Sequence, residues 1–255
     1  MLKFLNDCAH ILKAPHGNRL ALFTGLMTNQ KRLGFNVFHP DPGGISFLYR
    51  EIFARQNYYF RAETDSPLIF DCGANIGMST PYFKWLFPKS RIRCFEPDPY
   101  TYQILNKNIA NNRLELITTF QCALWDEEKK LDFFIDSKRP ATTVMSAFPE
   151  RGGAQAIEVS AEKLSKFITE PVDFLKLDVE GAETRVVQEL VQSRKIALVK
   201  QMVIEYHHHF GTQRANLSHL LASLECAGFD YQLHSSLYPV TTKNVYQDVL
   251  IHAYL

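Results

Sequence analysis

The sequence predicts an α/β protein with a doubly wound, mainly parallel sheet. From residue 68 onward, short apolar runs of strand length alternate with segments of helix length. Acidic residues, glycines and histidines come directly after several of these runs, at the positions where the strands of such a sheet end. With 255 residues and 46% hydrophobic content, the chain can also bury one complete α/β core.

The first 62 residues are less regular, and we expect them to form an N-terminal helical cap and a segment on the ligand side of the main domain, residues 63–255. Two amphipathic patterns near the start are separated by Pro15 and Gly17. An aromatic run at residues 58–60 is expected either to wall a ligand site or to pack on the core, since aromatic residues serve both purposes. The other expected elements are a short strand at residues 35–38, a loop at 39–44 and a helix at 45–54.

The elements of the expected sheet follow in regular order. The expected strands cover residues 68–71, 91–96, 116–122, 131–135, 172–178, 198–205 and 249–254. The expected helices cover residues 76–87, 100–111, 183–192 and 217–227, and residues 157–166 are expected to be a strand that enters a helix. Residues 123–126 are expected to form a turn, and residues 137–153, which are rich in small and polar side chains, a flexible flap.

Composition narrows the class of protein. The 28 basic and 27 acidic side chains give a formal net charge of +1 without a long run of one sign, which argues against nucleic acid as a partner. The five cysteines are scattered and form no C-x-x-C pair, so we expect buried thiols in a reducing compartment rather than zinc or redox sites. No apolar run is long enough for a transmembrane segment. These features predict a soluble, cytoplasmic protein.

Residues 67–77 read PLIFDCGANIG, an apolar strand followed by a glycine-bearing turn that opens a helix. Such a unit binds a nucleotide-like ligand at the carboxyl end of its strand. A dinucleotide site usually has three glycines in G-x-G-x-x-G. Here Asn75 replaces the second glycine, and Asp71 precedes the first. A carboxylate there repels a phosphate and suits a ligand with ammonium and sulfonium groups, as in S-adenosylmethionine.

Further donor-site candidates follow the second and third strands. Glu96 stands 25 positions after Asp71, where an acid accepts hydrogen bonds from ribose hydroxyls. Ala123 and Leu124 follow the third strand, where they either line a purine ring or simply pack. Asp71 can also serve as a helix N-cap. The expected donor-binding residues are Asp71, Gly73, Ala74, Asn75, Gly77, Glu96, Ala123 and Leu124.

Acids and histidines at the ends of the fourth and fifth long strands are candidates for the acceptor side. Methyl transfer to a hydroxyl needs alignment with the donor, and a base or a cation that deals with the hydroxyl proton. Histidine is the neutral-range base among these residues, and carboxylates with imidazoles also suit a divalent metal ion. The catalytic candidates are His207, Asp178, Glu205 and His208, and the metal candidates are Asp178, Glu180, Glu205 and His207. Lys176 is expected to be structural, with a role beside a reacting oxygen as the alternative.

Four motifs together resemble the FkbM-type S-adenosylmethionine-dependent methyltransferases. They are DCGANIG at residues 71–77, FEPDP at 95–99, FLKLDVEGAE at 174–183 and E-x-H at 205–207. The resemblance covers residues 68–210 and implies the Rossmann-like, seven-stranded sheet of class I methyltransferases. It matches Asp71, Gly73, Asn75, Gly77 and Glu96 to the donor site, and Asp178, Glu180, Glu205 and His207 to the acceptor side. It is weakest at residues 1–60 and 137–153, where acceptor specificity is expected.

The resemblance therefore implies an O-methyltransferase whose acceptor is a hydroxyl of a sugar, glycolipid or natural product, a small molecule or a glycan. Two alternatives stay open, an N-methyltransferase acting on a protein or small-molecule amine, and a donor-binding scaffold without activity. Against the first, the fourth strand lacks the Asn/Asp-Pro-Pro-Tyr/Phe tetrad that amino-group methylases of this fold often carry. The use of a divalent metal is left open.

Overall fold

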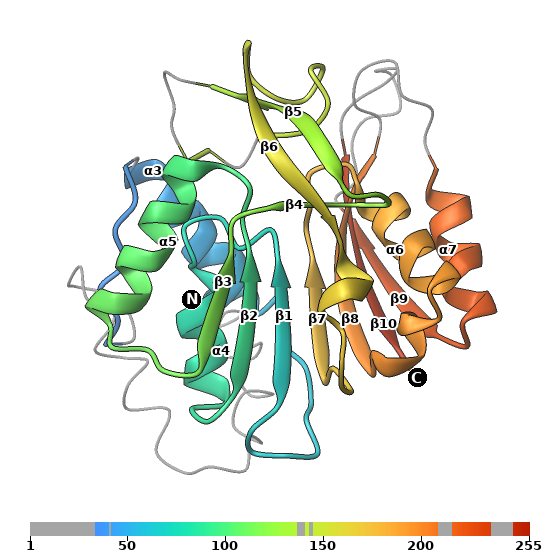
Figure 1. Cartoon of the computed structure of the whole chain (residues 1–255). Helices are drawn as coiled ribbons and strands as arrows, with labels where there is room; N and C mark the ends of the chain where they lie inside the picture. The colour runs from blue at the N-terminus through green and yellow to red at the C-terminus, as the bar shows by residue number, and fades with distance from the viewer. Residues whose placement is uncertain (1–33, 41, 137–140, 143–144, 209–215, 236–246) are drawn as a thin grey trace. The chain divides into compact units, whose positions relative to one another are not determined.

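The computed structural model describes residues 34–40, 42–136, 141–142, 145–208, 216–235 and 247–255. The chain divides into two compact units, residues 1–37 and residues 38–255. The two amphipathic patterns expected near the start lie outside the described residues. The domain division at residue 62 stays a prediction. All the helices and strands labelled in Figure 1 belong to the second unit.

A seven-stranded sheet forms the centre of the second unit, in the order β3-β2-β1-β7-β8-β10-β9 (Figure 1). Its strands are β1 (Leu68–Cys72), β2 (Arg91–Phe95), β3 (Ile117–Phe120), β7 (Phe174–Leu177), β8 (Gln201–His208), β9 (Asp230–Ser235) and β10 (Gln247–Tyr254). The first five in sheet order run parallel, and β10 is antiparallel to β8 and β9. The predicted fold class is confirmed. Because the strand order reverses between β1 and β7, their carboxyl ends border the crevice where such folds bind ligands.

Helices connect these strands. They are α3 (Pro42–Tyr49), η3 (Arg50–Ala54), α4 (Ser79–Leu86), α5 (Pro99–Asn111), η4 (Leu164–Phe167), α6 (Glu183–Gln192), η5 (Lys195–Leu198) and α7 (Leu217–Cys226). Figure 1 shows α6 and α7 side by side next to the part of the sheet that holds β8, β10 and β9. Within the described part of the chain, no helix has the length and apolar character that crossing a membrane requires.

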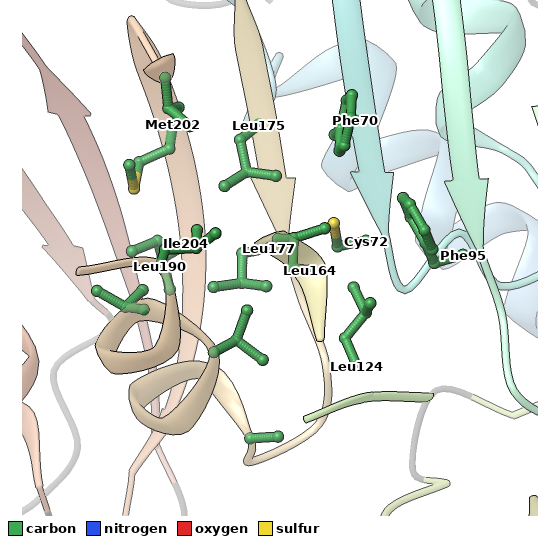
Figure 2. Close-up of a cluster of buried hydrophobic side chains, with 14 of the residues drawn as sticks. Phe70, Cys72, Phe95, Leu124, Leu164, Leu175, Leu177, Leu190, Met202 and Ile204 are labelled. Atoms are coloured by element: carbon green, nitrogen blue, oxygen red, sulfur yellow. The ribbon is translucent and has the colours of Figure 1, made fainter. Parts of the chain in front are cut away.

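Strand β7 shows how both faces of the sheet are buried. Leu175 and Leu177 point to one face, where they join apolar side chains of β1, β8 and α6 in a single cluster (Figure 2). Phe174 points to the other face, where its ring stacks on Phe60 with centroids 4.2 Å apart and meets Phe83 of α4 at 5.7 Å. A parallel strand covered on both faces reads as a nearly continuous apolar run, which is why these strands were visible in the sequence.

A second, three-stranded sheet follows β3 in the chain and was not expected. Its strands are β4 (Ala123–Trp125), β5 (Lys129–Ile135) and β6 (Gln155–Lys163), in the order β4-β6-β5. The prediction of a turn at residues 123–126 is wrong, because all three residues of β4 are buried and pair with β6. A run of three residues is too short to show a period.

Several boundaries near the N-terminal side differ from the expectation. Helix α3 begins at Pro42, so the loop predicted at residues 39–44 is wrong in its second half; proline suits the first turn of a helix. The helix expected at residues 45–54 is present, but it ends in the π-helical segment η3. Residues 35–38 form no strand beyond an isolated bridge at Phe35.

Two further differences lie farther along the chain. Helix α4 begins at Ser79, three residues later than predicted, because Asn75 and Gly77 take left-handed conformations that a helix does not accept. Strand β9 was missed because its sequence is polar and its residues are largely exposed. The flexible flap at residues 137–153 stays a prediction, since part of it lies outside the described residues.

Candidate active site

The turn after β1 packs directly on the end of β7. Gly73 has a φ of +81° and Asn75 a φ of +49°, a region that glycine and, less readily, asparagine accept. A Cβ atom on Gly73 would lie 1.7 Å from the backbone carbonyl oxygen of Asp178, and one on Gly77 would lie 2.5 Å from Cδ1 of Leu105. The motif's glycines are therefore required by close packing, and this packing places the predicted donor turn against the strand that carries the acceptor-side acids.

Asp71 lies beneath this turn. Its Oδ2 accepts a hydrogen bond from the Ser79 hydroxyl, and its Oδ1 lies 3.3 Å from Nζ of Lys176. Nζ of Lys176 also donates to the carbonyl oxygen of Gly73 at 2.7 Å. Burial lowers the pKa of Lys176, but the carboxylates of Asp178 and Asp71 outweigh burial and hold that pKa above its usual value. Asp71 and Lys176 thus form a buried ion pair that fixes the turn.

Glu96 follows β2 and holds the other side of the turn. Its Oε2 accepts the backbone N–H of Asn75 at 3.0 Å, and its Oε1 accepts that of Asp98 at 2.9 Å. Burial raises the pKa of Glu96 to about 8, although both N–H donors favour the ionised form. The carboxyl group is therefore fixed between the turn after β1 and the start of α5, which Asp98 caps through Thr101.

A cavity of about 390 Å³ is lined by residues that follow the carboxyl ends of β1, β2, β7 and β8. This size is within the range of small-molecule sites. Its apolar lining residues come largely from β4, β5 and the segment α3–η3, and they include Leu124, Trp125, Phe133, Phe47, Leu48 and Ile52. The donor-site candidates among the lining residues are Gly73, Ala74, Asn75, Glu96, Ala123 and Leu124. Asp71 and Gly77 are not among them, so their contribution is to shape the turn.

Asp178, Glu205 and His207 gather where β7 and β8 end. Each offers one ligand atom, and these three atoms all lie within 4.8 Å of one another. Nε2 of His207 lies 3.8 Å from Oδ1 of Asp178 and 3.3 Å from Oε2 of Glu180. Asp178, Glu180 and Glu205 line the cavity, whereas His207 is buried behind them. Strands that are neighbours in the sheet thus bring the predicted acceptor-side residues together.

The surroundings of His207 are strongly acidic. Its Nδ1 lies 2.9 Å from Oε1 of Glu183, which also accepts the backbone N–H groups of Val179 and Gly181. Burial lowers the pKa of His207, but Glu183 and Glu180 outweigh it and raise the pKa to about 10. With these neighbours His207 keeps its proton at neutral pH, which makes it a poor general base there.

The acids beside it are held by different partners. Burial raises the pKa of Glu180 to about 7, against the pull of His207 and of Arg151, which pairs with Glu180. Burial and the nearby Asp178 raise the pKa of Glu205 to about 8. The Tyr58 hydroxyl donates to Oε2 of Glu205 at 3.4 Å. The cavity therefore has a group of acidic side chains from the ends of β7 and β8 in addition to its apolar lining residues.

Comparison with known proteins shows which family the chain belongs to. The model of the methyltransferase FkbM domain matches residues 71–231. This chain belongs to the FkbM methyltransferase family. The match spans the turn after β1, Glu96, the end of β7 and the end of β8, so the motifs that resembled this family in the sequence are the ones that surround the cavity. The FkbM resemblance is confirmed, and with it a methyltransferase.

Two known methyltransferases align over most of the chain. Methyltransferase sdnD of Sordaria araneosa is 31% identical over 219 residues, which cover 72% of this chain and 82% of the relative. The 31-O-demethyl-FK506 methyltransferase FkbM of Streptomyces tacrolimicus is 30% identical over 234 residues, 77% of this chain and 86% of the relative. Among solved structures, methyltransferase FkbM from Methylobacillus flagellatus KT shares the fold, with a TM-score of 0.52 and 18% identity; 81% of this chain aligns with 48% of that one.

The histidines at and directly after the E-x-H motif do not all belong to the acceptor side of the site. His207 and Glu205 lie on the same face of β8, because residues two apart point to the same side of a strand. His208 points to the opposite face, where its ring lies 5.6 Å from that of Tyr206, so it does not join the acceptor-side residues. His209 lies outside the described residues.

Four residues at the FkbM site were not predicted individually. The aromatic run at residues 58–60 was expected either to wall a ligand site or to pack on the core. Tyr58 lines the cavity and Phe60 packs in the core, so each alternative is correct for one residue. Glu183 stands at the end of the FLKLDVEGAE motif, whose helical continuation hid its contact with His207. Asp248 faces His207 only through the pairing of β10 with β8, and no local signal marks it or Arg151.

Proposed function

We propose that this FkbM-family chain is an S-adenosylmethionine-dependent O-methyltransferase. One observation carries the proposal. The turn after β1 packs so closely on β7 that Gly73 has no room for a Cβ beside Asp178. Donor-side candidates such as Glu96 and acceptor-side candidates such as Asp178 therefore line a single cavity, as transfer between two bound molecules requires.

The residues on the donor side fit S-adenosylmethionine. Glu96 offers a fixed carboxyl group for ribose hydroxyls, and the apolar surface of Ala123 and Leu124 suits a purine. When bound, S-adenosylmethionine supplies a sulfonium methyl group that an oxygen nucleophile takes as the carbon–sulfur bond breaks and its electron pair stays on sulfur.

The acceptor side favours an oxygen nucleophile. Asp178 and Glu205 line the cavity, and either carboxyl group, when ionised, can accept the hydroxyl proton as the new oxygen–carbon bond forms. We place the acceptor among sugars, glycolipids and natural products, as small molecules or glycans. The name of the relative from Streptomyces tacrolimicus, which is 30% identical, describes methylation at an oxygen of such a compound. An N-methyltransferase and a donor-binding scaffold are the competing readings.

The test begins with the donor. Purified protein is titrated calorimetrically with S-adenosylmethionine and with its demethylated product, and binding of both is expected. Transfer of labelled methyl groups is then compared between a glycan and natural-product extract and pools of peptide and tRNA. Failure to bind either nucleoside would refute the donor, label only in peptide or tRNA would refute the hydroxyl acceptor, and donor binding without any transfer would favour the scaffold.

A further inference from the structure

The acceptor-side residues are arranged in a way that methyl transfer alone does not require. Among the residues that the structure describes, Asp178, Glu205 and His207 form a group whose ligand atoms all lie within 4.8 Å of one another. Ligand atoms that share a first-row divalent ion at about 2.0–2.2 Å stand within about 4.4 Å of each other. The group is therefore close to the spacing of a coordination sphere without any rearrangement of the backbone.

The orientation of His207 supports the same conclusion independently. Its Nδ1 is bound to Glu183, whose carboxylate is itself fixed by the backbone N–H groups of Val179 and Gly181. This contact leaves Nε2 directed at Asp178 and Glu180. A histidine that binds a metal through one ring nitrogen almost always gives the other N–H to a carboxylate or carbonyl oxygen in this way.

Carboxyl groups also outnumber the cationic side chains around these three residues. Arg151 pairs with Glu180, and Lys176 is shared between Asp71 and Asp178. Asp248 adds a further carboxylate, with Oδ1 3.8 Å from Nε2 of His207, because it is the register partner of His207 across β8 and β10. Carboxylates that converge at one end of a cavity without an equal number of cations favour a bound cation.

We infer that Asp178, Glu205 and His207 form a binding site for a divalent first-row metal ion at the acceptor end of the cavity. Two carboxylates and one imidazole suit Mn²⁺, Fe²⁺ or Zn²⁺ better than soft ions, which prefer thiolates, and on binding the ion replaces the proton on Nε2 of His207. The site itself stands on geometry. Its use rests on the proposed function: an ion there holds the acceptor hydroxyl beside the donor and makes its proton easier to remove.

The experiment uses Mn²⁺ as the probe. The full chain is freed of metals with a chelator, dialysed and titrated with Mn²⁺, while the spectroscopic signal of the free ion is followed by electron paramagnetic resonance. We expect one ion per chain, and at least about tenfold weaker binding in Glu205→Gln and in Asp178→Asn. Glu170→Gln is the matched control, because this carboxylate pairs with Arg91 at the surface and should leave Mn²⁺ affinity unchanged.

Each titration is repeated with saturating S-adenosylhomocysteine, whose binding is measured in parallel by calorimetry. Nucleoside binding by Glu205→Gln shows that this variant is folded, so its loss of Mn²⁺ supports the site. Equal Mn²⁺ affinity in wild type and both variants, or no Mn²⁺ binding by wild type, overturns the inference. If wild type binds Mn²⁺ but does not bind the nucleoside, the proposed function is overturned and the metal site stands. If the nucleoside displaces Mn²⁺, the placement of the site at the acceptor end is overturned.

Discussion

Glu96 illustrates at the residue scale how a carboxyl group is prepared for a neutral ligand. Both of its oxygens accept backbone N–H groups, which fixes the group, while burial raises its pKa to about 8. Ribose hydroxyls donate more strongly to a carboxylate than to a carboxylic acid. Ionisation of Glu96 and binding of the donor should therefore favour each other.

This coupling gives a prediction for pH. Glu96 is protonated below its pKa of about 8, so donor affinity in wild type should rise as pH increases from about 6.5 to about 9.5. Glu96→Gln should lose about tenfold or more in affinity at the upper end, since a charge-assisted hydrogen bond contributes about 1.5–3 kcal/mol. Calorimetric titration of both proteins with S-adenosylhomocysteine across this range checks it. The rise that is specific to Glu96 is the difference between the two curves, and parallel curves would contradict the assignment.

Gly73 gives a second prediction at this scale. Gly73→Ala places a Cβ against the Asp178 carbonyl oxygen and should destabilise the fold and abolish donor binding. Gly228→Ala is the matched control, because Gly228 also has a positive φ, of +89°, yet a Cβ there would meet only a side-chain atom of Leu255, at 4.0 Å. The control should cost about 1–2 kcal/mol of stability and keep donor binding. Urea unfolding and nucleoside titration measure the two effects, and equal losses in both variants would count against the role of close packing.

At the scale of elements, alternate side chains of β7 point to opposite faces of the sheet and have different roles. Leu175 and Leu177 fill the core cluster on the α6 side, whereas Phe174 and Lys176 point to the α4 side. Lys176 is the register partner of Asp71 on β1, which explains how a buried acid is tolerated beneath the turn. The expectation that Lys176 is structural fits this arrangement.

Removal of this lysine should be costly. Lys176→Met leaves the carboxylate of Asp71 buried without its counter-charge and should lower the free energy of unfolding by about 3–5 kcal/mol. Lys200→Met, which removes a half-exposed lysine from its pair with the largely buried Asp173, should cost less, because solvent screens this lysine. Urea denaturation of both variants tests the contrast; a small loss for Lys176→Met would show that Asp71 is satisfied in another way.

At the scale of the whole molecule, the cavity is lined by residues from several strands and connecting segments. A donor bound there should therefore stabilise the folded state. At a concentration of about 100 times its dissociation constant, S-adenosylhomocysteine should add about 2.7 kcal/mol to the free energy of unfolding. For a protein of this size the melting temperature should rise by about 5–10 °C. Thermal unfolding with and without the nucleoside measures the shift. Glu96→Gln at the same nucleoside concentration should shift less, and an unchanged melting temperature in wild type would speak against the donor.

Much of the sheet could be predicted because its signals are local. Strands β1 and β7 are nearly continuous apolar runs, and the residue after a strand is placed by the strand itself, as for Glu96 after β2 and Asp178 after β7. Strand segments were predicted within β5 and β6, but β4 and the pairing of these strands in a small sheet escaped prediction, because they depend on partners distant in the chain rather than on a period. The largely exposed β9 escaped because its sequence is polar.

The sequence by itself determined the fold class, the family and the two ends of the site, because strand runs and turn motifs are short-range features. Only the tertiary structure decided which residues face the cavity. It buried Asp71 beneath the turn, turned His208 away from His207, and brought Tyr58, Arg151 and Asp248 to the acceptor side. These outcomes depend on register and on packing between distant segments, and each sets the charge around a group whose chemical behaviour no local pattern can specify.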